Sequence, residues 1–584
     1  MAEKKEHGLL DAFSSTAIAG NDILSSCLYV CGIAIIFAGV WAPLVFVVIG
    51  LVLYLYKHVY TEVVEALPLN GGAYNCLLNA STKSLAAVAG VMTTLSYVAT
   101  SVISAKTASE YVHTVWHGLP VLPMTAGIIV FFAILVILGV KDSAKVAKGI
   151  FTLHIFTLTL FVTIGVLGIV NNGVGFLAEG FFKTQALFAQ EGAAKMLFFA
   201  FSASLLGVSG FESSANFVEE QAPGVFRKTL KSMLLGVVLF NPLITIVVLQ
   251  SLDLNTIAQV KDFVLADSAL QIGGVGLKYL IVADAFLVLS GAVLASFVGA
   301  SGLLYRMTLD HCLPSTILLP KLRSRNQNTT RIIIAFALLC LSILFVTKGA
   351  LLSLAGVYTI SFLGVMTLFA FGNVILRMTR PDLKRTYRGP LLYAFIAAAA
   401  TGAGIVGNIL IDPKNLVYFL TYFIPAIALV MTMIFRDYVL EALLHAVEQF
   451  PFLYNRVRPW FEHVIRPRII LFAHHPHKLY HSLEYIRKNE TSRNITVVFC
   501  KESGERSEVL LQKFEQYIAT FKEASVFENL SISLVVEEQQ TFGPEVVKAY
   551  ANRYRIQRNN VFIGSIHDSH DFSFEQLGGV RIIQ

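Results

Sequence analysis

Long apolar runs, each close to the length of a membrane-spanning helix, follow one another along the chain up to residue 435. A helix needs about 20 apolar residues to cross the hydrocarbon core of a bilayer. Short polar or Gly/Pro-rich segments separate the runs. The pattern predicts about twelve membrane-spanning helices, at residues 14–38, 42–66, 86–112, 121–140, 148–170, 193–218, 232–251, 277–305, 332–348, 351–377, 391–410 and 415–435.

The first apolar run contains polar side chains in its middle. On a helix, residues at positions i, i+3, i+4 and i+7 share one face. In this run they are Asp22, Ser25, Ser26 and Tyr29. A charged side chain near the centre of a bilayer costs about 2.5–3.5 kcal/mol on insertion scales, so an intramembrane Asp is a candidate functional residue. The cluster of oxygen atoms predicts a site for a dehydrated cation or for a proton.

The first and sixth runs share a second feature, an interruption by small and polar residues. In the first run it lies between Gly20 and Gly32, and in the sixth between Gly207 and Ser214. Two interrupted spans in corresponding positions are typical of an inverted repeat of five plus five helices, which places its binding site at the breaks. The unwound backbone of such a break offers carbonyl oxygens to a cation.

The pattern changes after Arg436. We expect a transmembrane domain at residues 1–436. We expect an interfacial helix and a linker at residues 437–467, followed by a soluble α/β domain at residues 468–584. In the soluble domain, short apolar runs alternate with stretches of helical periodicity, which predicts βαβ units and a parallel sheet. The expected strands are 469–472, 495–499, 530–536 and 561–563, and the expected helices are 478–488, 505–522 and 543–553.

Composition and charge support a membrane protein. Hydrophobic residues make up 55% of the chain and charged residues 14%, which is too apolar for a soluble protein of this length. Basic residues gather in alternate loops, and by the positive-inside rule we expect these loops and both termini in the cytoplasm. The net charge of +7 therefore reflects topology, and we expect no nucleic-acid partner. Because phosphate-binding, zinc and catalytic-triad motifs are missing, we expect neither a cofactor nor an enzymatic reaction.

Three stretches carry a family resemblance: Phe211–Pro223 at the end of the sixth span, Gly302–Pro314 at the end of the eighth, and Pro68–Tyr74 after the second. They resemble the signature stretches of the amino acid-polyamine-organocation superfamily, and the resemblance covers roughly residues 10–435. It implies a LeuT-like fold with two core spans added at the end, and transport by alternating access.

The sequence of the first broken span distinguishes between the substrate classes of this superfamily. Amino acid carriers of the superfamily usually have a Gly-Ser-Gly-type run there, whose amides hold the substrate carboxylate, whereas this chain has Leu24-Ser25-Ser26. The segment Asp22–Tyr29 instead resembles the potassium transporters of the KUP and KimA type, which have an Asp followed seven residues later by a Tyr. KimA has an acidic residue where this chain has Ser96, and that departure weakens the match.

Further matches to KimA are hydroxyl residues in the third and sixth spans, Thr100, Ser104 and Ser209. The resemblance implies a potassium site formed by Asp22, Tyr29, Thr100, Ser104 and Ser209, with Ser25 and Ser26 as further binding residues. Hydroxyl, carbonyl and carboxylate oxygens are the hard ligands that such an ion accepts. Alternatively, Thr100, Ser104 and Ser209 form hydrogen bonds between packed helices, as hydroxyl groups in membranes often do.

Two residues are candidates for proton coupling, Glu212 and Lys106. Glu212 follows the sixth-span break, where a carboxyl group that alternates between charged and neutral would carry a proton. Its alternative role is to cap the second half of that span. For Lys106 the sequence leaves three interpretations: it pairs with Asp284, it stands in for a sodium ion, or its side chain extends to the outer interface.

The C-terminal domain resembles a universal-stress-type α/β fold. It lacks the glycine pattern of nucleotide-binding members, so we expect it to have a structural or dimerising role and to be dispensable for the transport step.

We therefore interpret the chain as a proton-coupled secondary transporter of the cytoplasmic (inner) membrane whose substrate is potassium. One alternative is a proton-coupled amino acid permease that holds the substrate amine near Asp22 or Glu212, and the other is a transceptor whose soluble domain signals. The expected partners are potassium and a proton, or a small amino acid, together with the lipid bilayer and a second copy bound through the C-terminal domain.

Overall fold

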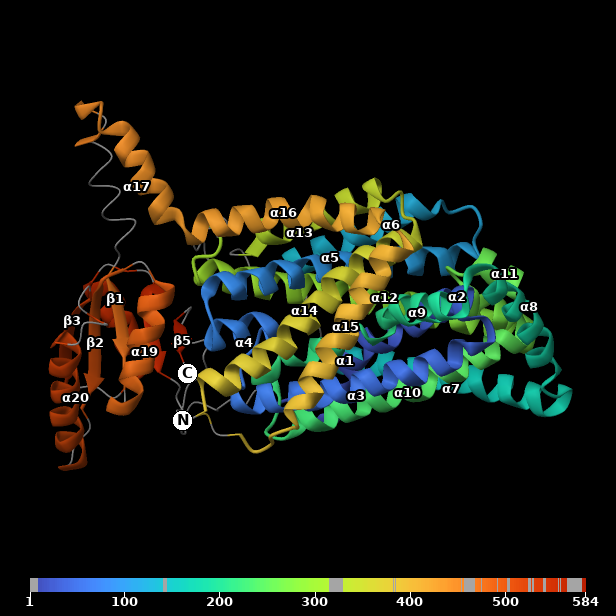
Figure 1. Cartoon of the computed structure of the whole chain (residues 1–584), viewed down its shortest axis with the longest axis horizontal. Helices are drawn as coiled ribbons and strands as arrows, with labels where there is room; N and C mark the ends of the chain where they lie inside the picture. The colour runs from blue at the N-terminus through green and yellow to red at the C-terminus, as the bar shows by residue number, and fades with distance from the viewer. Residues whose placement is uncertain are drawn as a thin grey trace. The chain divides into compact units, whose positions relative to one another are not determined.

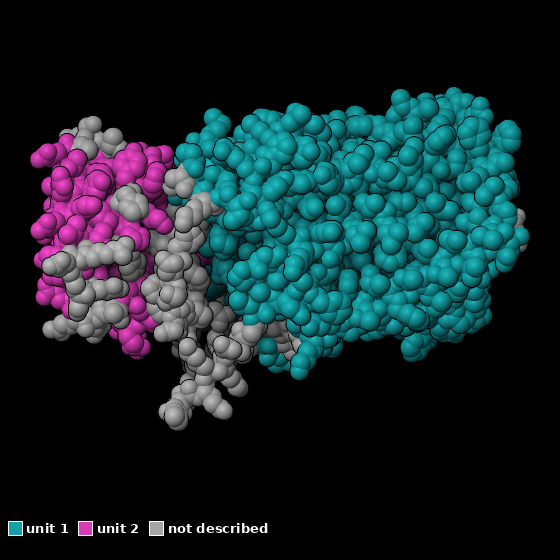
Figure 2. Space-filling model, turned by 90° about the horizontal axis from the view of Figure 1, so that it is seen from below, with its two compact units in different colours: residues 1–81, 88–305, 316–427 teal, residues 82–87, 306–315, 428–584 magenta. Residues whose placement is uncertain are grey.

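The chain forms two compact units, coloured separately in Figure 2. The first contains residues 1–81, 88–305 and 316–427, and the second contains residues 82–87, 306–315 and 428–584. The computed structural model describes residues 9–139, 144–314, 329–381, 383, 385–452, 454–455, 468–473, 475–490, 492–501, 505–523, 527, 530–538, 542–554, 556, 558–564 and 580–583.

The first unit is built from α-helices and short 3₁₀ helices (Figure 1). Its α-helices, three of which extend into the second unit, are α1 (Ala12–Ser25), α2 (Cys27–Ala38), α3 (Ala42–Ala66), α4 (Gly72–Ala80), α5 (Lys83–His113), α6 (Val121–Ile137), α7 (Ala144–Asn172), α8 (Gly175–Glu191), α9 (Ala193–Ser204), α10 (Val225–Ser251), α11 (Leu254–Val260), α12 (Val264–Leu309), α13 (Thr330–Val346), α14 (Leu351–Thr379), α15 (Leu391–Ile411) and α16 (Lys414–Ile434). The 3₁₀ helices are η1 (Gly39–Trp41), η2 (Leu205–Val208), η3 (Phe211–Asn216) and η4 (Val218–Glu220).

These helices confirm a polytopic membrane protein. Among the described residues, nine stretches are long and apolar enough to cross a membrane, and the first, Ala12–Ala66, contains both the broken first span and α3. The helices α6 and α13 are shorter and also apolar. The main difference from the predicted spans is α12, which begins before the predicted start at residue 277. The non-helical backbone of Gly274, with a φ of 71°, divides α12 into two helices, and the second begins close to the predicted start. Glycine adopts this positive φ at little cost.

The predicted interruption of the sixth span is present, whereas that of the first span is limited to Ser26, whose φ of −64° and ψ of −25° remain right-handed helical. The first span is divided at Ser26 into α1 and α2, and Asp11 caps the start of α1 by accepting a hydrogen bond of 2.8 Å from the Ser14 amide. The sixth span leaves α-helical geometry after Ser204 and continues as η2 and η3. Small and polar residues at these positions favour irregular backbone, because their side chains and amides compete with regular helix hydrogen bonds.

The second unit contains a parallel β-sheet with helices on both faces. The strands are β1 (Ile469–Phe472), β2 (Asn494–Cys500), β3 (Ser531–Glu537), β4 (Val561–Gly564) and β5 (Arg581–Ile583), in the order β3-β2-β1-β4-β5. All pairs are parallel, with Ile470 opposite Thr496 on one side and Val561 on the other. The helices are α17 (Arg436–Val447), α19 (Pro476–Asn489), α20 (Glu505–Glu523) and α21 (Pro544–Arg553), with the 3₁₀ helix η8 (Arg558–Asn560).

Alternating strand residues form two apolar layers in this unit. On one face Ile469 and Leu471 pack with residues of α19 and α20, and on the other Ile470 and Phe472 pack with residues of α21. Strands buried on both faces are apolar throughout, which explains why β1, β2 and β4 were readable from the sequence. β5 was not predicted, because it is only three residues long and begins with an arginine.

Most of the predicted linker, residues 453 and 456–467, lies outside the described residues.

Candidate functional site

The two broken spans contact each other in the first unit. The Ser26 hydroxyl group donates hydrogen bonds to the Ile23 carbonyl at 2.6 Å and to the Gly207 carbonyl at 3.2 Å, which links the first break to η2. The Ser213 hydroxyl group donates to the Asp22 carboxylate, which links the break to η3. The two segments singled out separately in the sequence are therefore in direct contact.

Gly210 makes this close approach possible. Its φ of 90° lies in the left-handed region, where other residues are strained. A Cβ atom on this residue would lie 2.8 Å from the Asp22 Cγ atom and 2.8 Å from the Ile23 amide nitrogen. Both the backbone conformation and the available space therefore require glycine beside the Asp22 carboxylate.

Two carboxyl groups lie in this region. Asp22 and Glu212 are both partly buried and interact electrostatically with each other. One carboxyl oxygen of Asp22 accepts the Ser213 hydrogen bond, and Glu212 Oε2 is buried and has no hydrogen-bond partner among the described residues. The Glu212 carboxyl group interacts with the backbone amides of Gly210 and of Glu212 itself.

Four tyrosine side chains surround the carboxyl groups. Tyr29 is within electrostatic range of Asp22, and Tyr60 is within range of Glu212. Tyr97 and Tyr358, from α5 and α14, are within range of both. Of these, only Tyr29 was predicted. The other three look like ordinary aromatic residues of apolar helices, and no sequence signal sets them apart.

The predicted hydroxyl residues differ in their contacts. Ser25 donates to the Asp22 carbonyl at 2.7 Å, and Thr100 donates to the Ser96 carbonyl at 2.9 Å. These bonds stay within one helix and leave the oxygen lone pairs available. Ser104 Oγ is buried and has no hydrogen-bond partner among the described residues. Ser209, between η2 and η3, is also buried.

Thr100 and the breaks are connected through side chains that the sequence did not indicate. The Tyr358 hydroxyl group is in hydrogen-bonding contact with Thr100, and the Asn216 amide donates to the Tyr97 hydroxyl oxygen at 2.6 Å.

The Asn241 amide on α10 is 1% exposed, and a Cβ atom on Gly207 would lie 3.3 Å from its Nδ2. Neither polar atom of the Asn241 side chain has a partner among the described residues.

The predicted pairing of Lys106 with Asp284 is wrong. Lys106 forms ion pairs with Glu110 at 2.6 Å and with Asp262 at 2.7 Å. Glu110 lies one helical turn after Lys106 on α5, and Asp262 lies in the short segment before α12. Two carboxylates thus compensate the positive charge of this buried side chain.

Asp284 instead pairs with His154, a residue that the sequence analysis did not single out. The distance from His154 Nδ1 to Asp284 Oδ2 is 2.7 Å, and both side chains are fully buried. His154 Nε2 lies 3.3 Å from the Leu24 carbonyl oxygen, in the last turn of α1. The pair connects α7 and α12 to the first break. A lone His in an apolar run gives no sign of this role until its partner is known.

The comparisons with known proteins concern the first unit. The sequence model of the family described as amino acid permease matches residues 10–435. Among solved structures, three crystal structures of mutants of the manganese transporter of Eremococcus coleocola are similar, with TM-scores of 0.45, 0.44 and 0.46. Each is 12% identical to this chain, and the match covers 74% of this chain and 95% of that chain. The comparison with curated proteins found no match.

Proposed function

We propose that the chain, which belongs to the amino acid permease family within the amino acid-polyamine-organocation superfamily, is a proton-coupled transporter of potassium ions. Family membership supports secondary transport, and the apolar helices support a multi-pass membrane protein. The coupling ion and the substrate are inferred from the chemistry of the two breaks. We place both termini in the cytoplasm and the protein in the cytoplasmic membrane, because of the loop charges.

One observation carries the proposal: Asp22 and Glu212 lie together at the breaks without a basic partner among the described ion pairs. A carboxylate removed from bulk water needs a nearby positive charge or a proton, because its desolvation is otherwise uncompensated. Two neighbouring carboxyl groups also disfavour each other's charged form. A site that holds one metal cation and one proton would balance this charge.

We assign the cation to Asp22. In this assignment Tyr29, Thr100, Ser104 and Ser209 supply neutral oxygen atoms, and Ser25 and Ser26 shape the backbone of the first break. Such a set of oxygen ligands suits a potassium ion, which is bound by carbonyl, hydroxyl and carboxylate groups. A single charged ligand would hold the ion without preventing its release.

We assign the transported proton to Glu212, next to the sixth-span break. The buried His154–Asp284 pair is a second candidate for coupling, because it connects α7 and α12 to the Leu24 carbonyl at the end of α1. Lys106 was a candidate for the same role. Its two ion pairs favour a structural role, in which it fixes α5 to the segment before α12.

An amino acid substrate is the alternative, and the family description favours it. In that case the substrate amine would lie near Asp22 or Glu212. The negative side chain of Asp22 within the first break makes this region less suitable for a substrate carboxylate, which is why we place potassium first.

Uptake into proteoliposomes separates the two substrates. Potassium transport predicts accumulation of rubidium, a potassium substitute, with uptake that rises as external pH falls, stops with a protonophore and does not require sodium. Accumulation of radiolabelled amino acids without rubidium would select the alternative. Sodium-dependent uptake that is insensitive to pH would contradict proton coupling for either substrate.

A further inference from the structure

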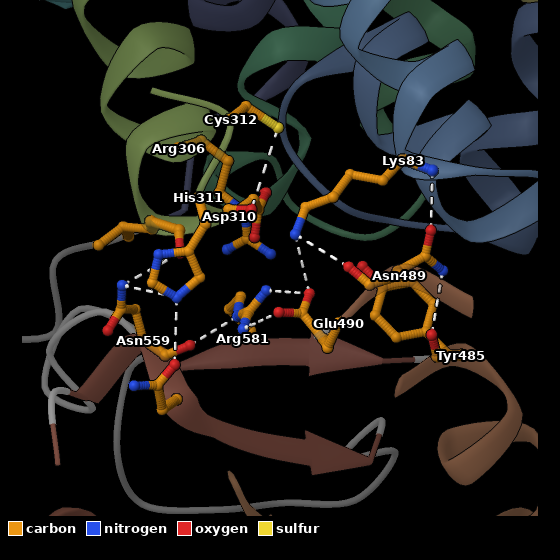
Figure 3. Close-up of polar contacts among 12 residues, drawn as sticks. Lys83, Arg306, Asp310, His311, Cys312, Tyr485, Asn489, Glu490, Asn559 and Arg581 are labelled. Atoms are coloured by element: carbon orange, nitrogen blue, oxygen red, sulfur yellow. Dashed lines mark hydrogen bonds and ion pairs between the residues drawn. The ribbon is translucent and has the colours of Figure 1, made fainter. Parts of the chain in front are cut away.

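The second unit contains more than the α/β fold. The first turn of α5 and the segment that follows α12 also belong to it, as residues 82–87 and 306–315. Figure 3 shows the polar side chains that connect these segments to the sheet and its helices. A helix end leaves backbone amide or carbonyl groups without partners inside the helix, so each end needs partners from elsewhere.

At the start of α5, Lys83 and the end of α19 cap each other. The Lys83 amide donates to Asn489 Oδ1 at 2.7 Å, which satisfies a free amide at the start of α5. The Lys83 ammonium group donates to the Asn489 carbonyl oxygen at 3.1 Å, at the end of α19. The same ammonium group forms an ion pair of 3.0 Å with Glu490.

At the end of α12, the loop before β4 plays the corresponding role. The Asn559 side-chain amide donates to the Leu309 carbonyl oxygen at 3.3 Å, on the last residue of α12. His311 Nε2 lies 3.1 Å from Asn560 Oδ1. Burial, together with the nearby Arg581 guanidinium, lowers the pKa of His311 to about 3, so this contact involves a neutral imidazole.

Glu490 and Arg581 join the two capping sites. Arg581 donates from Nη1 and Nη2 to the two Glu490 carboxyl oxygens at 2.5 and 2.9 Å, and from Nε to the Asn559 carbonyl oxygen at 2.6 Å. Both side chains are almost completely buried, with 7% of Glu490 and 2% of Arg581 exposed. A continuous path of hydrogen bonds therefore leads from the first residue of α5 to the last residue of α12. We call it the Glu490 network: Lys83, Asn489, Glu490, Asn559 and Arg581.

We propose that the α/β fold acts as a clamp that holds the start of α5 and the end of α12 together, and that the transport cycle requires the closed clamp. This inference rests on the proposed transport function. Further along these helices, α5 carries Thr100 and Ser104 and α12 carries Asp284. Alternating access moves some helices against others that stay fixed, and a tie between two helix ends would keep this pair fixed. The expectation that the soluble domain is dispensable for transport does not account for the network.

The test uses full-length variants. Glu490→Gln removes the charge that joins Lys83 to Arg581 and nearly preserves the size of the side chain. Glu484→Gln is the matched control, because Glu484 lies on the same helix and pairs only with the exposed Lys488 in the described ion pairs. Lys83→Met is a second variant that leaves the Glu490–Arg581 pair intact, so a loss of folding inside the sheet cannot explain its effect.

Two readouts are needed. We expect Glu490→Gln and Lys83→Met to slow rubidium uptake by about tenfold at equal membrane abundance, because loss of one partner of a buried ion pair weakens the contact between the two helix ends. We expect hydrogen exchange at residues 83–87 to become about tenfold faster. Glu484→Gln should change neither quantity. Uptake at the unaltered rate in both variants would overturn the clamp.

Hydrogen exchange also separates this inference from the proposed function. If the unaltered protein transports neither rubidium nor amino acids, the proposed function fails. The network is still tested by exchange in the purified protein, because that measurement needs no substrate. Unchanged exchange at residues 83–87 in both variants would then show that the network does not hold the helix end.

Discussion

Carboxyl groups removed from bulk water occur in both units, but their surroundings are opposite. In the second unit, Glu490 lies between the basic side chains of Lys83 and Arg581. In the first unit, Asp22 and Glu212 lie near each other and near neutral hydroxyl groups, without a basic partner among the described ion pairs. In the first arrangement, side chains of the protein itself compensate the negative charge of Glu490. For the second we infer that a cation or a proton supplies the missing charge, and this difference would separate a structural charge from a functional one.

The effect of the two basic side chains on the Glu490 charge is reflected in the pKa of Glu490. Burial alone would raise this pKa, but Arg581 and Lys83 outweigh burial and lower it to about 2. Removal of Glu490 would leave the buried charges of Arg581 and Lys83 uncompensated, which is more destabilising than the pairs are stabilising. The comparison predicts that changes in the Glu490 network alter the stability of the second unit as well as transport, whereas changes at the two breaks alter transport.

The largest expected effect is acid destabilisation of the second unit. The folded pKa of Glu490, about 2, lies below its usual value of 4.5, so its contribution is complete above pH 4.5 and is lost as the pH falls toward 2. The shift corresponds to about 3 kcal/mol. Thermal unfolding of the full-length protein between pH 7 and pH 3 measures it. Glu490→Gln should lose less stability over this range than Glu484→Gln, and equal losses would contradict the assignment.

Next in size is Asp22→Asn, which removes the negative charge beside the first break and keeps the size of the side chain. We expect initial uptake of rubidium to fall by at least about tenfold, because most of the electrostatic attraction for the cation is lost. Asp253→Asn is the control, since Asp253 is exposed and caps α11, a role that asparagine also performs. Transport by the Asp22→Asn variant at the unaltered rate would show that the ion site lies elsewhere.

The sequence predicted the fold better than the site for a physical reason. Apolar length and periodicity determine spans and buried strands, so α3 and β1 were predicted at their observed ends. A site depends on which helices meet, and a single sequence does not contain that information. Asp22 was visible because a carboxylate in an apolar run is unusual. Tyr97, Tyr358 and His154 were not, because aromatic residues and a lone histidine are ordinary in such runs.

The same limit explains the wrong pairing of Lys106. From sequence, Asp284 was the obvious acidic partner inside a span, whereas Asp262 lies in the segment between α11 and α12. Packing brings that segment to Lys106 and leaves Asp284 to His154. The parallel direction of the α/β sheet was predicted, but its strand order was not. Its connection to α5 and α12 was not predicted either, because Asn489 and Asn559 look like ordinary surface residues.

A smaller effect is expected for Glu212→Gln, which removes the proton-binding group without introducing a charge. We expect uptake to become independent of external pH between about 5 and 8, while residual uptake at the most favourable pH falls only several-fold. The reason is that Gln keeps a polar group at the break but cannot exchange a proton. Glu179→Gln, in an exposed pair with Lys183, is the control. A pH dependence that persists in the Glu212→Gln variant would move the coupling role to the His154–Asp284 pair.

The smallest expected effect concerns Ser104, whose hydroxyl group is buried and has no hydrogen-bond partner among the described residues. If this oxygen binds the ion, Ser104→Ala should raise the KM for rubidium by about two- to tenfold, the range for loss of one neutral interaction. If the hydroxyl group only fills space, its removal should leave the KM unchanged and increase the thermal stability, because an unpaired buried polar group is costly. Ser109→Ala on the same helix is the control, since the Ser109 hydroxyl group already donates to the Ala105 carbonyl at 2.8 Å. The two variants together decide whether the hydroxyl groups of α5 belong to the site that Asp22 defines or to ordinary helix packing.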